Sequence, residues 1–439
     1  MNFVNNIRRA AGWLDSNSTD DFVYISDKQK IIYPEVTGYF IPTLKKIGLH
    51  KKARSFAEHL VSIQSRDGSW GLGGKNYIFD TAQIIDGLSE FKEYSREIEK
   101  AVDYIDSLAI NGRLKNQYGK KIGSHIFPRV IWCLKKVGYD TSKMEKVHFN
   151  KDTRIFNCLS HFYCYSFEGY ARMNMDCTDF INVIKKYNNI IPETNSVKTI
   201  CYTGLSQSAL SLFLCNKLDS GMRALELVSD YQNDSGGFFG SNGKYFPKEE
   251  IGWAVKFYID ACFESSSLWF KKNKDKFKSD FEGGDKDTRL TFVRSNIEKC
   301  DSVLDVGCGK TRYIKNISCL SKSAIDIVEV DVGGDISFAV GSCLDIPFDD
   351  NKFDKIICAE TLEHAVFQDM AIKEMIRVVK KGGSILIIDK DGDSKSSSRV
   401  HFMEEWPKFN KLLKGYDYTK VNLSVKGSNM PFVGVIIRC

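Results

Sequence analysis

The chain of 439 residues is too long for one ordinary domain, and its 43% hydrophobic and 27% charged residues exclude a disordered chain. A formal net charge of only +6 leaves no strongly basic stripe, so nucleic acid is not an expected partner. The 13 cysteines form no C-x-x-C pair, which argues against a disulfide framework or a zinc knuckle, and we predict no metal site.

The hydropathy of the chain predicts no membrane span, because no run of about 18 apolar residues occurs. The first residues, MNFVNNIRR, lack an apolar core of signal-peptide length. We therefore expect a cytoplasmic protein, and peripheral contact with a membrane stays open.

The first clear helix signal covers residues 53–64. Apolar residues recur there at the spacing of one helix face, and turn residues follow at 65–74. The helix ends in Gln64-Ser-Arg-Asp-Gly68-Ser-Trp70, and a second helix ends similarly in Gln232-Asn-Asp-Ser-Gly236-Gly-Phe238. A weaker copy lies at residues 105–114. This repetition of helix pairs predicts a helical array.

The phrase Q-x-x-D-G-S-W resembles the repeat of the α/α-toroid superfamily of terpenoid cyclases and prenyltransferases. That superfamily uses aspartate-rich motifs, and the nearest sequence here, Phe79-Asp80-Thr81-Ala82-Gln83, holds one aspartate, which disfavours terpene cyclisation. Residues 33–43, 161–170, 202–207 and 236–241 look more like toroid proteins of bacterial polysaccharide synthesis.

The toroid resemblance covers about residues 30–262 and implies helix pairs around a central cavity. Aromatic planes and carboxylates suit sugars, because sugar rings stack on aromatic faces and hydroxyls donate to carboxylates. The residues expected to line the cavity are Tyr33, Glu35, His161, Glu168, Trp253 and Lys256. Helix capping and core packing are the alternative explanation for each of them.

The densely charged stretch at residues 271–288 is the best linker candidate. We predict an all-α toroid at residues 1–272, a linker at 273–288 and an α/β domain at 289–439. In the last segment, short apolar runs at 303–306, 355–359 and 384–388 alternate with helical patterns, as in βαβ units, and a last strand is expected at 431–438.

The run from Ser302 to Thr311 predicts an apolar strand, a glycine turn and then a helix. It resembles motif I of class I S-adenosylmethionine-dependent methyltransferases, with Thr311 in place of the usual third glycine. A P-loop would need glycine at the position of Leu304, and a nicotinamide-binding motif would need it at that of Arg312. Both alternatives therefore fail.

Several later segments match the same resemblance in order. The strand at 324–330 is predicted to end at Asp331, whose carboxylate would bind ribose hydroxyls; Glu329 is the alternative, and Asp326 would lie in mid-strand. Residues 340–354 resemble the segment that flanks the adenine, and Leu362-Glu363-His364 is a triplet frequent in small-molecule methyltransferases. The resemblance implies a Rossmann-like fold and these cofactor-binding residues: Asp305, Gly307, Cys308, Gly309, Asp331, Ser342, Cys343, Leu344 and Glu360.

Methylation of a sugar hydroxyl needs a base, because the hydroxyl pKa lies far above 7. His364 is the first candidate, His401 is the second, and a structural role for His364 is the alternative. We therefore expect an enzyme that uses S-adenosyl-L-methionine to O-methylate a sugar or glycan, lipid-linked glycans included, in bacterial polysaccharide biosynthesis.

Two alternatives stay open. In the first, the protein is bifunctional, and its toroid is a glycan lyase, hydrolase or epimerase beside a separate methyltransferase. In the second, the methyl acceptor is of the polyprenyl or terpenoid type.

Overall fold

The computed structural model describes residues 3–276, 284, 287–299, 301–394, 401–425 and 428–439. The chain divides into two compact units. The helical unit comprises Asn5–Lys45 and Leu49–Leu268, and the sheet unit comprises Trp269–Cys439 with residues 3–4 and Lys46–Gly48. The boundary thus falls before Trp269 rather than after residue 272. Most of the predicted linker lies outside the described residues. No helix in the described ranges has the length and hydropathy needed to cross a membrane.

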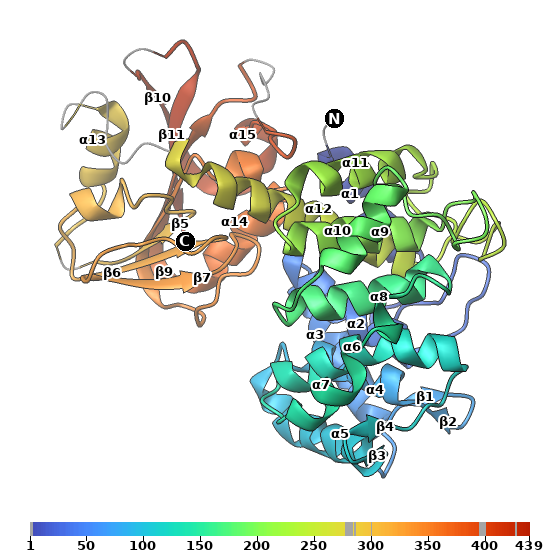
Figure 1. The fold of residues 1–439 in the computed structure, drawn as a ribbon. Helices are drawn as coiled ribbons and strands as arrows, with labels where there is room; N and C mark the ends of the chain where they lie inside the picture. The colour runs from blue at the N-terminus through green and yellow to red at the C-terminus, as the bar shows by residue number, and fades with distance from the viewer. Residues whose placement is uncertain (1–2, 277–283, 285–286, 300, 395–400, 426–427) are drawn as a thin grey trace. The chain divides into compact units, whose positions relative to one another are not determined.

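The helical unit is built from consecutive α-helices (Figure 1). They are α1 (Val4–Ser16), α2 (Pro34–Lys46), α3 (His50–Ser62), α4 (Ile78–Leu88), α5 (Ser95–Ser107), α6 (Lys120–Lys136), α7 (Ser142–His148), α8 (Ser160–Arg172), α9 (Thr178–Lys186), α10 (Tyr202–Leu214), α11 (Leu218–Asp230) and α12 (Gly252–Asn273). Two short hairpins, β1–β2 (Gly71–Leu72, Lys75–Asn76) and β3–β4 (Ala109–Ile110, Arg113–Leu114), follow α3 and α5.

Burial separates these helices into two classes. α4 and α10 are buried around almost their whole circumference: neither contains lysine, arginine or glutamate, and their polar side chains, Asp80 and Gln207 among them, are buried as well. α5 buries only Ala101 and Ile105, and α11 buries a narrow stripe, because charged residues fill their other faces. The even-numbered helices α4 and α10 therefore lie inside the unit, and the odd-numbered helices α5 and α11 lie on its outside.

The inner helices contact one another in sequence order, at places where small residues let two backbones approach. A Cβ on Gly38 of α2 would lie 2.7 Å from Ile84 of α4, and one on Gly169 of α8 would lie 2.5 Å from the Pro128 backbone of α6. α4 packs on α6, and α8 packs on α10. The hydroxyl of Thr43 in α2 donates to Asp260 of α12 at 3.1 Å, so the last inner helix meets the first.

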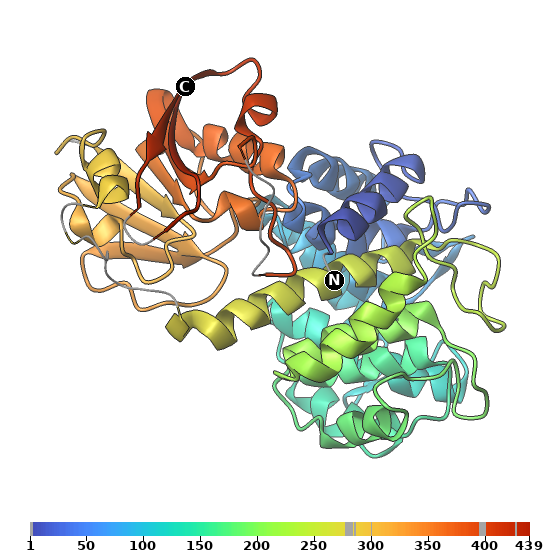
Figure 2. The same cartoon turned by 90° about the horizontal axis from the view of Figure 1, so that it is seen from above.

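The predicted repeat is confirmed as a structural unit. The amide of Gln64 donates to the carbonyls of Gly68 and Glu97, each at 2.9 Å, and Gln232 donates to those of Gly236 and Asn6. Each glycine has a positive φ and packs on the backbone of another outer helix: Gly68 on Lys100 of α5, Gly112 on Lys143 of α7, and Gly236 on Arg9 of α1. The dark blue α1 consequently lies beside the green α11 (Figures 1 and 2).

The sheet unit is a seven-stranded sheet with strand order β10-β11-β9-β8-β5-β6-β7. Its strands are β5 (Ser302–Val306), β6 (Ser321–Asp326), β7 (Ile336–Val340), β8 (Phe353–Ala359), β9 (Val379–Lys390), β10 (Asp417–Leu423) and β11 (Phe432–Arg438). Strands β9, β8, β5, β6 and β7 are parallel, and β11 pairs antiparallel with both β9 and β10.

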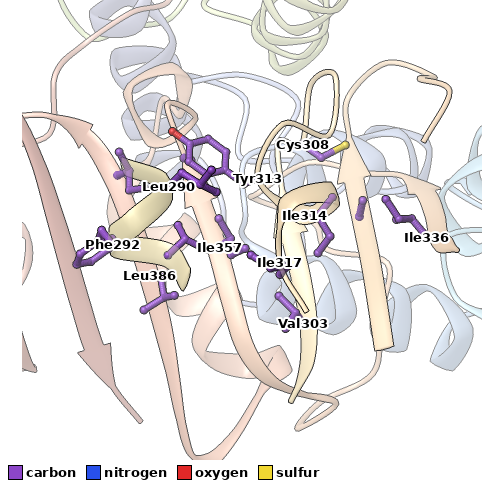
Figure 3. Packing of buried hydrophobic residues seen from close by; sticks show 14 of the residues in the cluster. Leu290, Phe292, Val303, Cys308, Tyr313, Ile314, Ile317, Ile336, Ile357 and Leu386 are labelled. Atoms are coloured by element: carbon purple, nitrogen blue, oxygen red, sulfur yellow. The ribbon is translucent and has the colours of Figure 1, made fainter. Parts of the chain in front are cut away.

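The helices of this unit are α13 (Thr288–Arg294), α14 (Gln368–Val378) and α15 (Phe409–Leu412). The helix predicted after the glycine turn is wrong, since only a 3₁₀ turn at Ile314–Asn316 links β5 to β6. Instead, Leu290 and Phe292 of α13 pack with the loop residues Ile314 and Ile317 over the buried strands (Figure 3).

Candidate functional site in the sheet unit

The glycine turn lies at the carboxyl end of β5, an interior strand between β8 and β6. Gly307 and Gly309 have φ values of 71° and 50°, in the region that favours glycine. The amides of Gly307 and Cys308 donate to the carbonyl of Ile325 at 2.9 and 3.0 Å, which fixes the turn against β6. A Cβ on Gly307 would lie 2.2 Å from the hydroxyl oxygen of Thr361, so the turn also packs tightly on the loop after β8.

Two acids flank this turn. Asp305 is fully buried in β5, and its Oδ2 atom has no hydrogen-bond partner in the described chain. Burial raises its pKa to about 7. Asp326 ends β6, and its Oδ2 atom accepts a hydrogen bond from Gly309 N at 2.9 Å. Burial also raises the pKa of Asp326.

The prediction that the second strand ends at Asp331 is wrong. β6 ends at Asp326, because the residues that follow it turn away from the sheet, and the Val328 amide donates to the Asp326 carboxylate at 3.2 Å. Asp331 is exposed in the loop beyond, where its carboxylate accepts from Gly333 N. Asp326, which the sequence analysis put in mid-strand, is therefore the acid beside the glycine turn.

The predicted adenine segment forms a tight turn after β7. The Ser342 hydroxyl accepts from the amide of Leu344 at 3.1 Å, and Ser342 and Asp345 exchange backbone hydrogen bonds. Leu344 is buried, and burial raises the pKa of the Cys343 thiol to about 11. This turn offers apolar surface and backbone groups, which suit an adenine ring.

Glu360 follows β8 directly and has a positive φ of 53°, a strained backbone that is typical of functional sites. Its carboxylate accepts from Arg289 at 3.0 Å, from Arg312, and from the Tyr313 hydroxyl at 3.3 Å. Burial alone would raise the Glu360 pKa, but Arg312 and Arg289 outweigh it and hold the pKa below its usual range.

The sequence analysis missed Arg289, Arg312 and Tyr313 as members of this cluster. The signal for Arg312 was its place three residues after Gly309, inside the turn. Arg289 had no such signal, because it comes from α13, which precedes motif I in the chain. The guanidinium groups of Arg289 and Arg312 could bind the carboxylate of a ligand, and Glu360 could accept a hydrogen bond from a ligand's ammonium group.

His364 lies in a 3₁₀ turn at Leu362–His364, among aromatic rings. Its ring contacts Phe270 edge-on at 5.1 Å and His401 at 5.5 Å, and His401 packs on Trp269 at 4.4 Å. His364 Nδ1 and His401 Nε2 are both buried without a hydrogen-bond partner in the described chain. Burial, and then Lys390, lowers the His364 pKa to about 3, so this imidazole is neutral and weakly basic.

The candidates in the helical unit fall into two sets. Glu168 pairs with Arg129 at 3.0 Å, and Lys256 pairs with Asp260 at 2.9 Å, so both charges are already matched inside the unit. The other four candidates are Tyr33, Glu35, His161 and Trp253. The His161 ring stacks on that of Trp253 at 6.4 Å and also contacts the ring of Tyr165. Burial raises the pKa of Tyr33 and of Tyr165, and the charge of Glu35 raises both further.

Comparison with known proteins adds to this geometry. Residues 304–387 match the family described as a methyltransferase domain. The chain is 27% identical over 123 residues to methyltransferase GfsG of Streptomyces halstedii, covering 25% of this chain and 44% of that protein. It is 30% identical over 166 residues to the ubiquinone/menaquinone biosynthesis C-methyltransferase UbiE of Pseudomonas aeruginosa, covering 34% of this chain and 57% of that one.

Among solved structures, the chain is similar to Burkholderia thailandensis 1,6-didemethyltoxoflavin-N1-methyltransferase, with bound 1,6-didemethyltoxoflavin and S-adenosylhomocysteine. Identity is 12% and the TM-score 0.32, over 39% of this chain and 86% of that one. The chain spans about half the length of the curated relatives it matches.

The glycine turn and the unpartnered Asp305 oxygen fit a cationic, adenosine-bearing cofactor. The matched family model covers both the turn and the strand after it. Residues 304–387 of the sheet unit thus resemble a methyltransferase domain, and the cofactor is S-adenosyl-L-methionine.

Proposed function

We propose that the protein transfers a methyl group from S-adenosyl-L-methionine to a hydroxyl group of a sugar or glycan in bacterial polysaccharide biosynthesis, and that the helical unit binds this acceptor. The observation that carries the first part is the glycine turn of Gly307 and Gly309, bordered by Asp326 and by Glu360 with its two arginines.

Different residues around the turn would bind different parts of the cofactor. Asp326 would accept from the ribose hydroxyls, the turn at Ser342–Leu344 would flank the adenine, and Arg289, Arg312 and Glu360 would hold the amino acid end. The cofactor supplies an electrophilic methyl group on a sulfonium. The protein then has to align the acceptor oxygen with that carbon and exclude water, and alignment can contribute about 7–11 kcal/mol.

The proton of the acceptor hydroxyl needs a destination during transfer. His364 and His401 each present an unpartnered ring nitrogen at the carboxyl side of β8 and β9. Their lowered pKa values make them weak bases in the absence of ligands. We propose that one of them accepts this proton at its unpartnered ring nitrogen.

We further propose that the helical unit is a closed α/α toroid. The contacts of Gly236 with α1, and of Asp260 with α2, support closure at the outer and the inner layer. Its interior carries tyrosines, a tryptophan and a histidine together with carboxyl groups, the side chains that suit sugars.

Methyl transfer from labelled S-adenosyl-L-methionine to polysaccharide fractions tests the proposal. We expect label in a glycan fraction, with one S-adenosylhomocysteine formed for each methyl group transferred. Label that appears only in lipid quinone or terpenoid extracts would favour the polyprenyl alternative. S-adenosylhomocysteine formation without any labelled glycan would contradict the acceptor class.

A further inference from the structure

The helical unit exposes its large apolar side chains in one kind of segment. These segments lead from an odd-numbered helix into the even-numbered helix after it, and we call them entry segments: residues 17–33, 63–77, 108–119, 149–159, 187–201 and 231–251. Ile110 is 76% exposed and Ile155 is 51% exposed; the others among the described residues of the unit are Ile31, Ile32, Ile63, Leu72 and Val197. The return segments, which lead from an even-numbered to an odd-numbered helix, are wholly described and expose none; they are residues 89–94, 137–141, 173–177 and 215–217.

The entry segments contact one another around the unit and so form one face, the loop face. The contacts join Ser26 with Ile251 and Cys201 with Ser241 by β-bridges, Ser160 with Glu193 and Leu114 with His148 by hydrogen bonds, and Tyr77 with Tyr118 by ring stacking. Each contact lies within these segments or at the helix end beside one, and together they link all six. The hairpins β1–β2 and β3–β4 belong to this face (Figure 1).

Four entry segments place an exposed aliphatic side chain beside a cation. The pairs are Leu72 with Lys75, Ile110 with Arg113, Ile155 with Arg154, and Val197 with Lys198. In the two hairpins the members of a pair lie opposite each other across the turn, and cross-strand partners project to the same side. In the other two segments they are neighbours in the chain. Hydrocarbon and a group that attracts anions thus recur together four times.

A hollow in the loop face adds cations to the third of these pairs. It measures about 690 Å³ and is lined by residues of two entry segments and of α9, among them Lys151, Arg154 and Lys186. Arg154 pairs with Asp179 at 3.1 Å, whereas Lys151 and Lys186 form no ion pair with any described residue. The exposed Ile155 also lines the hollow. The hollow therefore offers two available cations beside an apolar side chain.

The four segments with such pairs also differ in charge from the rest of the loops. They are residues 63–77, 108–119, 149–159 and 187–201, which we call the basic sector of the loop face, and they hold seven lysines and arginines and three acidic residues. The other two entry segments hold four lysines and six acidic residues, and the return segments hold two lysines and four acidic residues. Positive charge and exposed aliphatic side chains therefore coincide in the basic sector.

This combination limits the kind of partner. An acidic glycan could pair with the cations, but its hydroxyl groups would not cover the aliphatic side chains. A bilayer with anionic lipids offers phosphate groups at its surface and hydrocarbon directly beneath them, and it repeats both along its plane. A cation beside an aliphatic side chain fits that boundary, because the cation reaches phosphate while the aliphatic group enters the hydrocarbon.

We propose that the basic sector of the loop face docks on a lipid bilayer that contains anionic lipids. Ile110 and Ile155 insert between the headgroups, and Arg113 pairs with lipid phosphate beside Ile110. Lys151 and Lys186 bind a headgroup phosphate in the hollow. This docking goes beyond methyl transfer and does not depend on the identity of the methyl acceptor.

The full-length protein is sedimented with vesicles of phosphatidylcholine alone, and with vesicles in which a third of the lipid is phosphatidylglycerol. We expect binding to the anionic vesicles to be at least about tenfold tighter, because each lysine or arginine near such a surface favours binding about fivefold. Binding should fall sharply at about 1 M salt, where the screening length is about 3 Å.

Ile110→Ser and Ile155→Ser should each weaken binding to the anionic vesicles about tenfold, because inserted hydrocarbon is lost. Arg113→Gln should weaken it about fivefold. Leu320→Ser, at a 73% exposed position of the sheet unit, and Lys92→Gln, in a return segment, are matched controls and should bind as the unaltered protein does. Titration with S-adenosyl-L-methionine should be unchanged in every variant, which shows that each is folded.

Equal binding to both kinds of vesicle would overturn the proposal, and so would equal losses in the loop-face and control variants. Full binding in both isoleucine variants would also contradict it, because attraction of charges alone would then suffice. Two other occupants are tested in the absence of vesicles. If the protein binds neither kind of vesicle, binding of polygalacturonate would assign the basic sector to an acidic glycan, and self-association that is lost in Ile110→Ser would assign it to a second copy of the chain.

Discussion

The Oδ2 atom of Asp326 accepts a hydrogen bond from the backbone amide of Gly309 at 2.9 Å, which ties the end of β6 to the glycine turn after β5. This contact puts one acid at the mouth of the cofactor site and leaves Asp331 in the exposed loop beyond it.

Asp326→Ala should weaken binding of S-adenosyl-L-methionine by about 1–3 kcal/mol, because charge-assisted hydrogen bonds to the ribose would be lost. Calorimetric titration of the full-length protein measures this change. Asp331→Ala is the matched control and should bind as the unaltered protein does. A larger loss of affinity in Asp331→Ala than in Asp326→Ala would indicate that Asp331 binds the ribose.

Gly307→Ala should destabilise the sheet unit and abolish cofactor binding. The new Cβ would lie 2.2 Å from the Thr361 hydroxyl, and the φ of 71° would add strain of about 1–3 kcal/mol. Gly309→Ala is the comparison, since its Cβ would meet no atom within 4 Å. The melting temperature of Gly307→Ala should lie well below that of Gly309→Ala. Equal melting temperatures would show that Thr361 can move to make room for the added Cβ.

Asp305→Asn should reduce the loss of stability that occurs as the pH rises. Burial raises the Asp305 pKa from its ordinary 3.8 to about 7, so the folded state holds a proton that the unfolded state has released. The unfolding free energy therefore falls between about pH 4 and pH 7, by at most about 1.4 kcal/mol per unit. Urea unfolding at pH 5 and pH 7 measures the difference. An identical slope in Asp305→Asn and in the exposed variant Asp331→Asn would contradict this assignment.

Glu168→Gln should destabilise the helical unit by about 1–3 kcal/mol, because buried Arg129 loses one of its two carboxylates and keeps Asp86. Glu35→Gln should cost less, since burial and the neighbouring Asp80 raise the Glu35 pKa and so favour its neutral form. Urea unfolding followed by helical circular dichroism compares the two. A larger loss in Glu35→Gln would mean that Glu168 lines a binding site and Glu35 holds the fold.

Periodicity and motif spacing predicted the helix at α3, the glutamine–glycine repeat and the central strands β5 and β8. These are local features, in which a residue's role depends on neighbours in the chain. The end of β6 could not be predicted in this way, because the apolar run continues to Val330 while the Asp326 carboxylate, by accepting from two loop amides, ends the strand.

Ion pairs between residues far apart in the chain could not be predicted from the sequence either. Arg289 meets Glu360 across 71 positions, and Arg129 meets Glu168 across 39, so neither ion pair leaves a local pattern.

Hydrogen exchange of the full-length protein, with and without S-adenosylhomocysteine, tests most directly that the sheet unit holds the cofactor at its glycine turn. Amides at residues 306–312 and 324–329 should exchange more slowly with the ligand, and Gly307→Ala should remove this protection. The helical unit should be unaffected. Unchanged exchange at both segments under saturating ligand, or protection confined to the helical unit, would contradict the account.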